Sequence, residues 1–203
     1  MDNTDGQSEW TRTRRRDATS TRQRLLDAAA ELIAERGWGQ VTTRAIAERA
    51  GLPHGTVSYH FQGKHELLTE AALHTIEQLF PLDELKAVES LEHLILLIQT
   101  EVGNRDSITS VGTGVLLEAM RESARNPVLR QRLAALLRDY RQVVAELART
   151  RQHQNTDIGS EPSPSALAIL IAAVGDGLLL HVLLDPELDV GEATGALLTL
   201  LRR

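Results

Sequence analysis

Cysteine is absent from the 203-residue sequence, which excludes disulfides, thiolate metal ligands and a cysteine nucleophile. Motifs of catalysis are missing as well: there is no GxSxG elbow, no HExxH pair and no phosphate-binding P-loop. Gly37 and Gly39 follow a predicted helix rather than a strand and lack the third glycine of a dinucleotide-binding loop. The seven histidines are scattered and have no Cys or Asp framework for a metal. We therefore expect no enzyme, no cofactor and no metal site.

Signals for export or membrane insertion are also weak. The first predicted helix follows a polar, arginine-bearing segment rather than the apolar core of a signal peptide. Residues 166–184 are nearly all apolar and, at 19 residues, long enough to cross a membrane. Asp176 lies near their centre, however, where a charge costs roughly 2.5–3.5 kcal/mol on the insertion scale. We expect a cytoplasmic protein without membrane contact, in which this segment forms a helix covered on all sides.

Lysine is scarce, and charge is unevenly placed along the chain. There are two lysines, Lys64 and Lys86, and the net charge is −6. Residues 10–66 hold ten Arg and Lys against six Asp and Glu, whereas residues 67–203 hold twelve against nineteen. Phosphate binding needs local positive charge, and an acidic body is repelled by a duplex. The contrast supports nucleic-acid binding by the N-terminal part of the chain.

Helical periodicity runs through the chain after the first 20 residues, and no segment has a convincing strand pattern. We predict an all-α protein of about nine or ten helices. Its parts are a disordered basic arm at 1–18, a helix-turn-helix domain at 19–79 and a helical body at 80–203. The predicted helices are 22–36, 42–50, 54–61, 64–80, 90–102, 108–125, 127–151, 166–184 and 191–201.

Residues 42–61 predict two short helices joined by a tight turn. Thr42 and Thr43 offer N-cap hydroxyls for the first helix, in which Ile46 lies on the buried face. Gly51 suits the left-handed conformation that ends a helix. The second helix is too short to bury much, yet it is rich in donors, acceptors and aromatic rings. We interpret the pair as a helix-turn-helix whose second helix enters a DNA major groove.

An amphipathic helix precedes this pair, and another helix begins at Lys64. The pattern consists of Leu25-Leu26-Asp27-Ala28-Ala29, Gly37, Val41-Thr42, Ile46-Ala47, Ala50-Gly51, Gly55-Thr56-Val57, His60-Phe61, Lys64 and Leu67-Leu68. On these residues the sequence resembles the N-terminal domain of the TetR/AcrR family of transcription regulators. The family usually places Tyr directly after its Gly-Thr-aliphatic triplet, where it contacts a phosphate. Here that position is Ser58 and Tyr59 follows, so either residue is a candidate for that role.

In this interpretation Thr42, Thr43 and Lys64 hold phosphates and fix the register on the duplex. Arg44 is the best candidate for a bidentate contact with guanine, worth about 1–3 kcal/mol of discrimination. The full predicted DNA-binding set is Thr42, Thr43, Arg44, His54, Gly55, Thr56, Ser58, Tyr59, His60 and Lys64.

The resemblance also implies a homodimer, formed by a four-helix bundle of the last two long helices of each subunit, here 127–151 and 166–184. Gly175 and Gly177 would let the partner backbone approach closely. A dimer presents two recognition helices to half-sites roughly 34–36 Å apart, so we expect a near-palindromic operator in double-stranded DNA. Repression is the family's usual mode, and we take it as the expectation.

The family's regulators leave DNA when a small-molecule effector enters the helical body, so we expect a pocket there. Six side chains on or beside apolar faces are candidates, and the alternative for each is a surface ion pair or a satisfied buried polar group. Because aromatic residues make up only 3% of the chain, an aliphatic or amphipathic effector is favoured over a flat one. The candidates are His74, Glu118, Met120, Arg121, Asp176 and His181.

Two points stay open in the sequence. The cluster of Arg12, Arg14, Arg15 and Arg16 is either part of a solvated tail or an arm that adds phosphate or minor-groove contacts. For the chain as a whole, the alternative to a DNA-binding regulator is a helical adaptor that binds protein without DNA sequence specificity.

Overall fold

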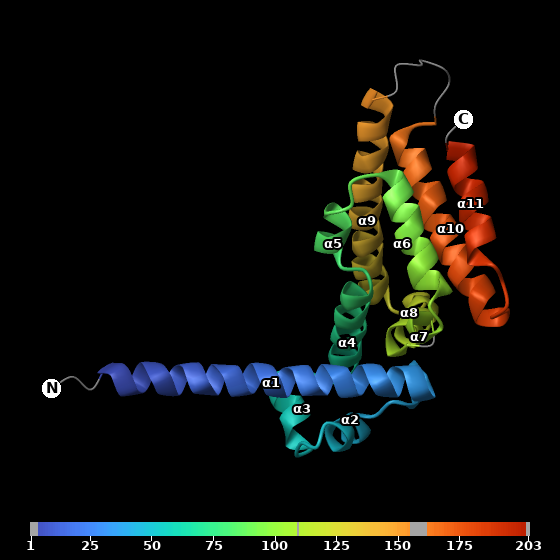
Figure 1. The fold of residues 1–203 in the computed structure, drawn as a ribbon. Helices are drawn as coiled ribbons and strands as arrows, with labels where there is room; N and C mark the ends of the chain where they lie inside the picture. The colour runs from blue at the N-terminus through green and yellow to red at the C-terminus, as the bar shows by residue number, and fades with distance from the viewer. Residues whose placement is uncertain (1–3, 109, 155–161, 202–203) are drawn as a thin grey trace.

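A long helix runs across the foot of an upright helical bundle, and a small helix pair lies on its other side (Figure 1). This computed structural model describes residues 4–108, 110–154 and 162–201. Those residues form eleven α-helices, one 3₁₀ helix and no strand, which confirms the all-α prediction. The elements are α1 (Thr4–Arg36), η1 (Trp38–Gln40), α2 (Thr43–Arg49), α3 (Gly55–His60), α4 (Lys64–Leu79), α5 (Leu82–Lys86), α6 (Leu91–Gly103), α7 (Arg105–Ile108), α8 (Val111–Ser123), α9 (Pro127–Gln154), α10 (Pro164–Leu184) and α11 (Val190–Leu201).

Helix α1 is longer than predicted. Its inner residues Leu25, Ala29 and Ile33 are fully buried, as expected. Instead of the disorder predicted for residues 1–18, however, the helix begins at Thr4. A helix with a packed nucleus extends at little cost, and the added turns contain no proline and a single glycine. The side chains of Arg12, Arg14, Arg15 and Arg16 lie outside the described part of the chain.

One hydrophobic core joins the helix-turn-helix domain to the base of the body. It contains buried residues of α1 to α4 together with Val115 and Ala119 of α8 and Leu129 of α9. Helix α4 passes from this core directly into the bundle (Figure 1). The hydrophobic core is therefore continuous across the predicted domain boundary near residue 79. The helix-turn-helix domain and the base of the body thus share one packed interior.

Above this base, α6, α9 and α10 surround a second core that includes Leu91, Val144 and Ile171. Helix α11 packs against α6, where the Thr194 hydroxyl donates a 2.8 Å hydrogen bond to Gln99 Oε1. Among the described residues α10 is the one helix long and apolar enough, by length and composition, to cross a membrane. Its inner face is part of the body's core, and its opposite face is open.

The open face of α10 is an apolar stripe. A Cβ added at Gly177 would meet nothing within 4 Å, whereas one added at Gly175 would lie 3.8 Å from Ile98 of the same chain. Of the two glycines predicted to face a partner, Gly175 therefore faces inward, and only Gly177 is open. The exposed apolar residues recur at helical spacing and are Ala166, Ile169, Leu170, Ala173, Leu180 and Leu184, and the helix also exposes the polar residues Ser165, Asp176 and His181.

Two short helices were not predicted. Pro81, expected only to end the preceding helix, is the N-cap of α5, and α7 occupies the expected turn after Gly103. The helix expected at 108–125 consequently begins at Val111, after the Ser110 hydroxyl accepts a hydrogen bond from the Thr113 N–H. Met120 shares the apolar periodicity of this helix, but it is 44% exposed.

Candidate nucleic-acid interface and effector region

Helix α2 is capped as predicted. The Thr42 Oγ1 accepts a 3.1 Å hydrogen bond from the Ala45 N–H, and Ile46 is fully buried beneath the helix. The cap uses a lone pair of the hydroxyl, so its proton stays available for a phosphate oxygen. Thr43 is half-buried and Arg44 is exposed on the outer side. The outer surface at the start of α2 therefore combines hydroxyl donors with a guanidinium.

The turn between α2 and α3 depends on a left-handed residue. Gly51 has a φ of 64°, a conformation that glycine adopts without strain. Its N–H donates to the Glu48 carbonyl at 3.0 Å. From α1, Arg24 Nη2 donates to the Ala50 carbonyl at 2.6 Å, which holds the end of α2 against α1. These contacts set the direction in which α3 leaves the turn.

Helix α3 buries one side and presents the other. Val57 and Phe61 are buried, and the Arg22 guanidinium lies 5.1 Å from the centre of the Phe61 ring. Tyr59 is 82% exposed, although large aromatic side chains are mostly buried in folded proteins. The other predicted contacts on α3 also reach the surface: His54, Gly55 and Ser58 are exposed, and Thr56 and His60 are half-buried.

Most arginines of this domain are engaged within the protein. Arg49 of α2 donates to Glu35 at 2.7 Å and to Glu31 at 2.9 Å, both on α1. The hydrogen bond from Arg49 lowers the pKa of Glu35. Arg44, in contrast, forms no ion pair within the described residues and is exposed. It is consequently the guanidinium of α2 that is free to contact a base.

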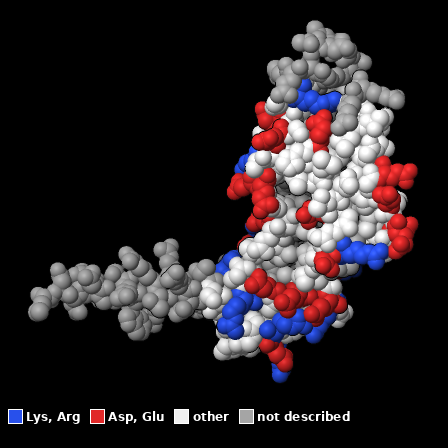
Figure 2. Space-filling view, viewed as in Figure 1, with Lys and Arg blue, Asp and Glu red and all other residues white. Residues whose placement is uncertain are grey.

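Lys64 lies at the first turn of α4, beside the 3₁₀ segment η1. Its Nζ donates to the Gly39 carbonyl at 3.2 Å, and the side chain is half-buried. An ammonium has three donors, so this bond leaves two for a phosphate. Figure 2 shows the charge contrast on one face: Lys and Arg gather on the lower domain, where acidic residues also lie, whereas the bundle above carries mostly Asp and Glu.

The predicted effector residues are not brought together by the contacts that the structure describes. His74 Nε2 lies 2.8 Å from Gln23 Nε2 and 3.1 Å from Gln78 Nε2, between α1 and α4. Glu118 and Arg121 form a 2.8 Å ion pair at the foot of the body. His181, like Met120, is exposed. His74, Glu118 and Arg121 thus have polar partners within the protein, which corresponds to the alternative to a ligand contact.

Asp176 has a different environment, on α10 beside α9. Asp176 is exposed, yet partial desolvation of its carboxyl raises its pKa. Burial also raises the pKa of Tyr140 to about 12, and the charge of Asp176 adds to this rise. The Tyr140 and Phe80 rings meet edge to face, with centres 6.4 Å apart. Among the described residues no cationic side chain pairs with Asp176, so this carboxylate lies near Tyr140 without a counter-ion.

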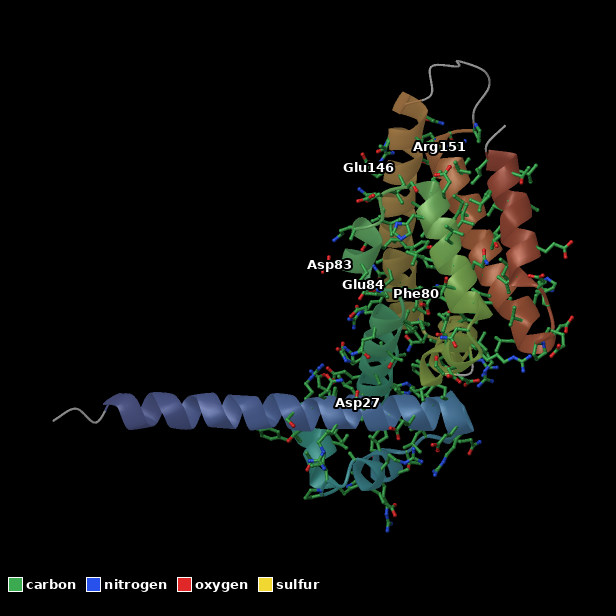
Figure 3. The ribbon with its side chains drawn as sticks, viewed as in Figure 1. Asp27, Phe80, Asp83, Glu84, Glu146 and Arg151 are labelled. Carbon is green, nitrogen blue, oxygen red and sulfur yellow. The ribbon has the colours of Figure 1, made fainter. Side chains whose placement is uncertain are left out.

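An open groove of about 460 Å³ lies between α5 and α9. Asp83 and Glu84 on α5 and Glu146 on α9 make this side of the body acidic (Figure 3). None of the predicted effector residues is among those that line the groove in the described part of the chain. Its lining is Leu82, Lys86, Asp139, Gln142, Val143, Glu146 and Leu147.

Two links between the body and the DNA-binding domain were missed in the sequence. The Trp38 N–H donates a 2.8 Å hydrogen bond to Glu118 Oε2. The Glu70 carboxylate forms ion pairs with both Arg22 and Arg132. The partners lie 48 to 80 positions apart. Local spacing gives no signal for such pairs. The one sequence signal for the Trp38 contact is Gly37. Because a glycine at this position is expected to end the first long helix, Trp38 is expected to follow a bend in the chain.

Two family models match this chain. The model described as "Bacterial regulatory proteins, tetR family" matches residues 25–71. The model described as "BetI-type transcriptional repressor, C-terminal" matches residues 92–203. Together they cover the helix-turn-helix, the first half of α4, and the body from the start of α6 onward.

Individual relatives agree with these models. The HTH-type transcriptional regulator UidR of Escherichia coli K12 is 26% identical over 179 residues, which cover 85% of each chain. A transcriptional regulator from Saccharomonospora viridis, solved in complex with choline, is 26% identical with a TM-score of 0.74, covering 91% of this chain and 97% of that one. NalD of Pseudomonas aeruginosa, the secondary repressor of the MexAB-OprM efflux pump, is 25% identical with a TM-score of 0.67, covering 91% and 94%.

Proposed function

The chain belongs to the TetR family of transcriptional regulators, and we propose that it is a repressor that binds a near-palindromic operator as a homodimer and leaves DNA when a small cation binds its helical body. Members of the family are DNA-binding regulators and not enzymes. Repression is the mode named for the C-terminal family model and for relatives such as NalD. A regulator of this kind works in the cytoplasm.

The observation that carries the DNA contact is the outer face of α2 and α3. Tyr59 and Arg44 are exposed on this face. Among the described residues the Tyr59 hydroxyl has no hydrogen-bond partner and the Arg44 guanidinium has no ion-pair partner. Val57 and Phe61 anchor the helix pair in the core. Arginine pairs with the O6 and N7 atoms of guanine, and hydroxyl and ammonium donors bind phosphates. We assign Arg44 to a base, Thr42 and Lys64 to phosphates, and either Ser58 or Tyr59 to a further phosphate.

The open stripe of α10 supports the dimer. A helix that is apolar on all sides needs cover on all sides, and here the side away from α6 and α9 is uncovered. Gly177 lies in the middle of the stripe with free space above it, so a partner helix can approach closely. A second copy related by a two-fold axis would bury both stripes and set the two recognition helices at half-site spacing.

The effector assignment is based on Asp176. An exposed carboxylate near Tyr140, with no cationic partner in the described chain, offers a cation a negative charge, and the neighbouring aromatic ring would add a cation–π contact. The solved relative from Saccharomonospora viridis holds choline, a compact quaternary ammonium. We therefore propose a small, non-flat organic cation as effector, in agreement with the low aromatic content of the chain.

The function is tested by selecting duplexes from a random-sequence DNA pool with the purified protein. We expect enrichment of a two-fold-related pair of half-sites, retained binding in the presence of a polyanion competitor, and a dimer in sedimentation. A monomer at micromolar concentration, or equal binding to selected and random duplexes, would contradict the regulator and leave the protein-binding adaptor.

A further inference from the structure

We propose that Glu118 of α8 fixes the orientation of the helix-turn-helix relative to the body, by holding the backbone of Trp38. Glu118 would thus be a positioning residue that keeps the two recognition helices of a dimer at the separation that the operator requires. This inference rests on the proposed function. Beyond that function, it identifies Glu118 as the residue through which the body would act on the DNA-binding surface.

The contact is made where α1 ends. Gly37 has a φ of 77°, which turns the chain back toward α8 and aims the Trp38 N–H at Glu118 Oε2, 2.8 Å away. A Cβ added at Gly37 would lie 3.2 Å from the same oxygen. One turn earlier on α8, a Cβ at Gly114 would lie 3.0 Å from the Ala34 Cβ of α1. The two helices therefore approach closely along one face of α8, and the carboxylate sits at the end of that face.

The carboxylate is held in its charged form. The hydrogen bond from Arg121 lowers the pKa of Glu118, burial acts in the opposite direction, and the Trp38 N–H lowers the pKa further. Arg121 Nη2 lies 2.8 Å from the oxygen that accepts the Trp38 N–H. Hydrogen bonds to an ionised acceptor are stronger than those between neutral groups. The bond to Trp38 is thus stronger than an ordinary backbone contact, and it joins two domains.

Trp38 carries a second signal. Its indole is 3% exposed, and its Nε1 has no hydrogen-bond partner among the described residues. An unpaired buried donor raises the free energy of the arrangement that contains it. The position of Trp38 is therefore determined by packing and by Glu118 rather than by the indole N–H.

The held segment leads directly to the DNA-binding residues. Trp38 begins η1, whose Gly39 carbonyl accepts from Lys64 Nζ, and the chain continues through Val41 to Thr42 and α2. A displacement of Trp38 thus moves two of the proposed phosphate contacts together. Glu118 is the one body side chain with a described hydrogen bond to this segment.

The experiment compares the variants Glu118→Ala and Glu118→Gln with Glu122→Gln as the matched control, since Glu122 is a carboxylate of the same helix with no described hydrogen bond to Trp38. The probes are a duplex that the wild-type protein has selected from a random pool, and versions of it with the half-site separation changed by one or two base pairs. We expect Glu118→Ala to bind the selected duplex about three- to tenfold more weakly and to discriminate less between separations. Glu118→Gln keeps an oxygen acceptor for Trp38 but not the charge, so it should restore part of the affinity, and Glu122→Gln should stay within about twofold of wild type.

A readout without DNA accompanies the binding data. In a Trp10→Phe background Trp38 is the sole tryptophan, and acrylamide quenching reports its exposure. Glu118→Ala should increase the quenching of Trp38, while the thermal transition and the dimer remain. Unchanged affinity and unchanged separation dependence in Glu118→Ala would overturn the inference but leave the proposed function intact. Equal losses on every duplex, with a lowered thermal transition, would also overturn it. A wild-type protein that selects no duplex would instead remove the proposed function.

Discussion

Arg132 Nη1 of α9 lies 2.6 Å from Glu70 Oε1 of α4. The other oxygen of the same carboxylate accepts Arg22 of α1 at 3.1 Å. Glu70 is thus shared by the body, the connecting helix and the DNA-binding domain. Burial raises the pKa of Glu70, but the hydrogen bonds from Arg132 and Arg22 outweigh it, so the net pKa lies below the ordinary value.

Glu70→Gln is expected to lower the free energy of unfolding by about 0.5–1 kcal/mol at neutral pH, since all three groups keep some solvent and salt screens them. Because the pKa of Glu70 is depressed by folding, the stabilisation is complete above its unfolded value of about 4.5 and disappears as pH falls through the folded value. Urea unfolding of wild type and variant from neutral to acid pH measures this. A difference that stays constant with pH would contradict the ion-pair explanation.

The two lysines provide a matched pair for the DNA contact. Lys64→Ala is expected to weaken binding to all duplexes alike and to reduce the slope of log affinity against log salt by about 1, as for the removal of one phosphate-binding cation. Lys86→Ala, on α5, should change neither quantity.

Arg44→Ala should instead weaken binding by about 1–3 kcal/mol, and only at one base position. Binding to the selected duplex and its single-base variants, at several salt concentrations, separates the two roles. A base-selective effect of Lys64→Ala would show that its assignment is wrong.

The subunit interface is tested by two leucines of equal exposure. Leu180 on α10 is 51% exposed and Leu96 on α6 is 49% exposed. Leu180→Glu would place a carboxylate in the proposed interface and should shift the protein toward monomer in sedimentation, with loss of operator binding. Leu96→Glu should leave the dimer and DNA binding unchanged. If Leu96→Glu dissociates the protein and Leu180→Glu does not, the interface lies on α6 instead.

The local elements of the DNA-binding domain were predictable because their signals are local. The hydroxyl of Thr42, the glycine at position 51 and the buried spacing of Val57 and Phe61 lie within one or two turns of the backbone they determine. The Glu118–Arg121 ion pair joins residues three apart on α8, and it is an instance of the surface ion pair that the sequence offers as the alternative to a ligand contact.

The rest depends on which helices pack together. Glu118 meets Trp38 across 80 positions, and Gly175 and Gly177 look alike in sequence although one faces Ile98 and the other open space. The effector candidates were chosen as polar groups on apolar faces. That pattern does not distinguish His74, which is held by Gln23, from Asp176, which has no counter-ion among the described residues.

The N-terminal arginines give a further test of DNA contact. Deleting residues 2–16 removes Arg12, Arg14, Arg15 and Arg16, and if these form an arm the deletion should weaken operator binding. The salt slope should also fall, by about 0.9 for each phosphate that the arm no longer neutralises. A variant with the four arginines changed to glutamine keeps the length of α1 and controls for it. An unchanged slope in both variants would identify the segment as a solvated tail.

The last prediction concerns the effector site. Choline should raise the thermal transition of the wild-type protein, because a ligand that binds only the folded state stabilises it by about 2.7 kcal/mol at a hundredfold excess over its dissociation constant. Asp176→Asn should weaken choline binding at least about tenfold, a difference of about 1.4 kcal/mol. It should not destabilise the free protein, since burial raises the pKa of Asp176 and thus disfavours its charge.

Two controls define this site. Asp139 lines the α5–α9 groove and precedes Tyr140 in the sequence. Asp139→Asn should leave choline binding unchanged. A loss of choline binding in this variant would place the cation in the groove instead. The neutral isostere 3,3-dimethylbutanol should bind far more weakly than choline if Asp176 supplies the attraction. Because Asp176 must be ionised and burial raises its pKa, choline affinity should fall with acid at a higher pH than an ordinary aspartate would give. Equal affinity for choline and its neutral isostere would show that shape alone is recognised and would remove Asp176 from the effector site.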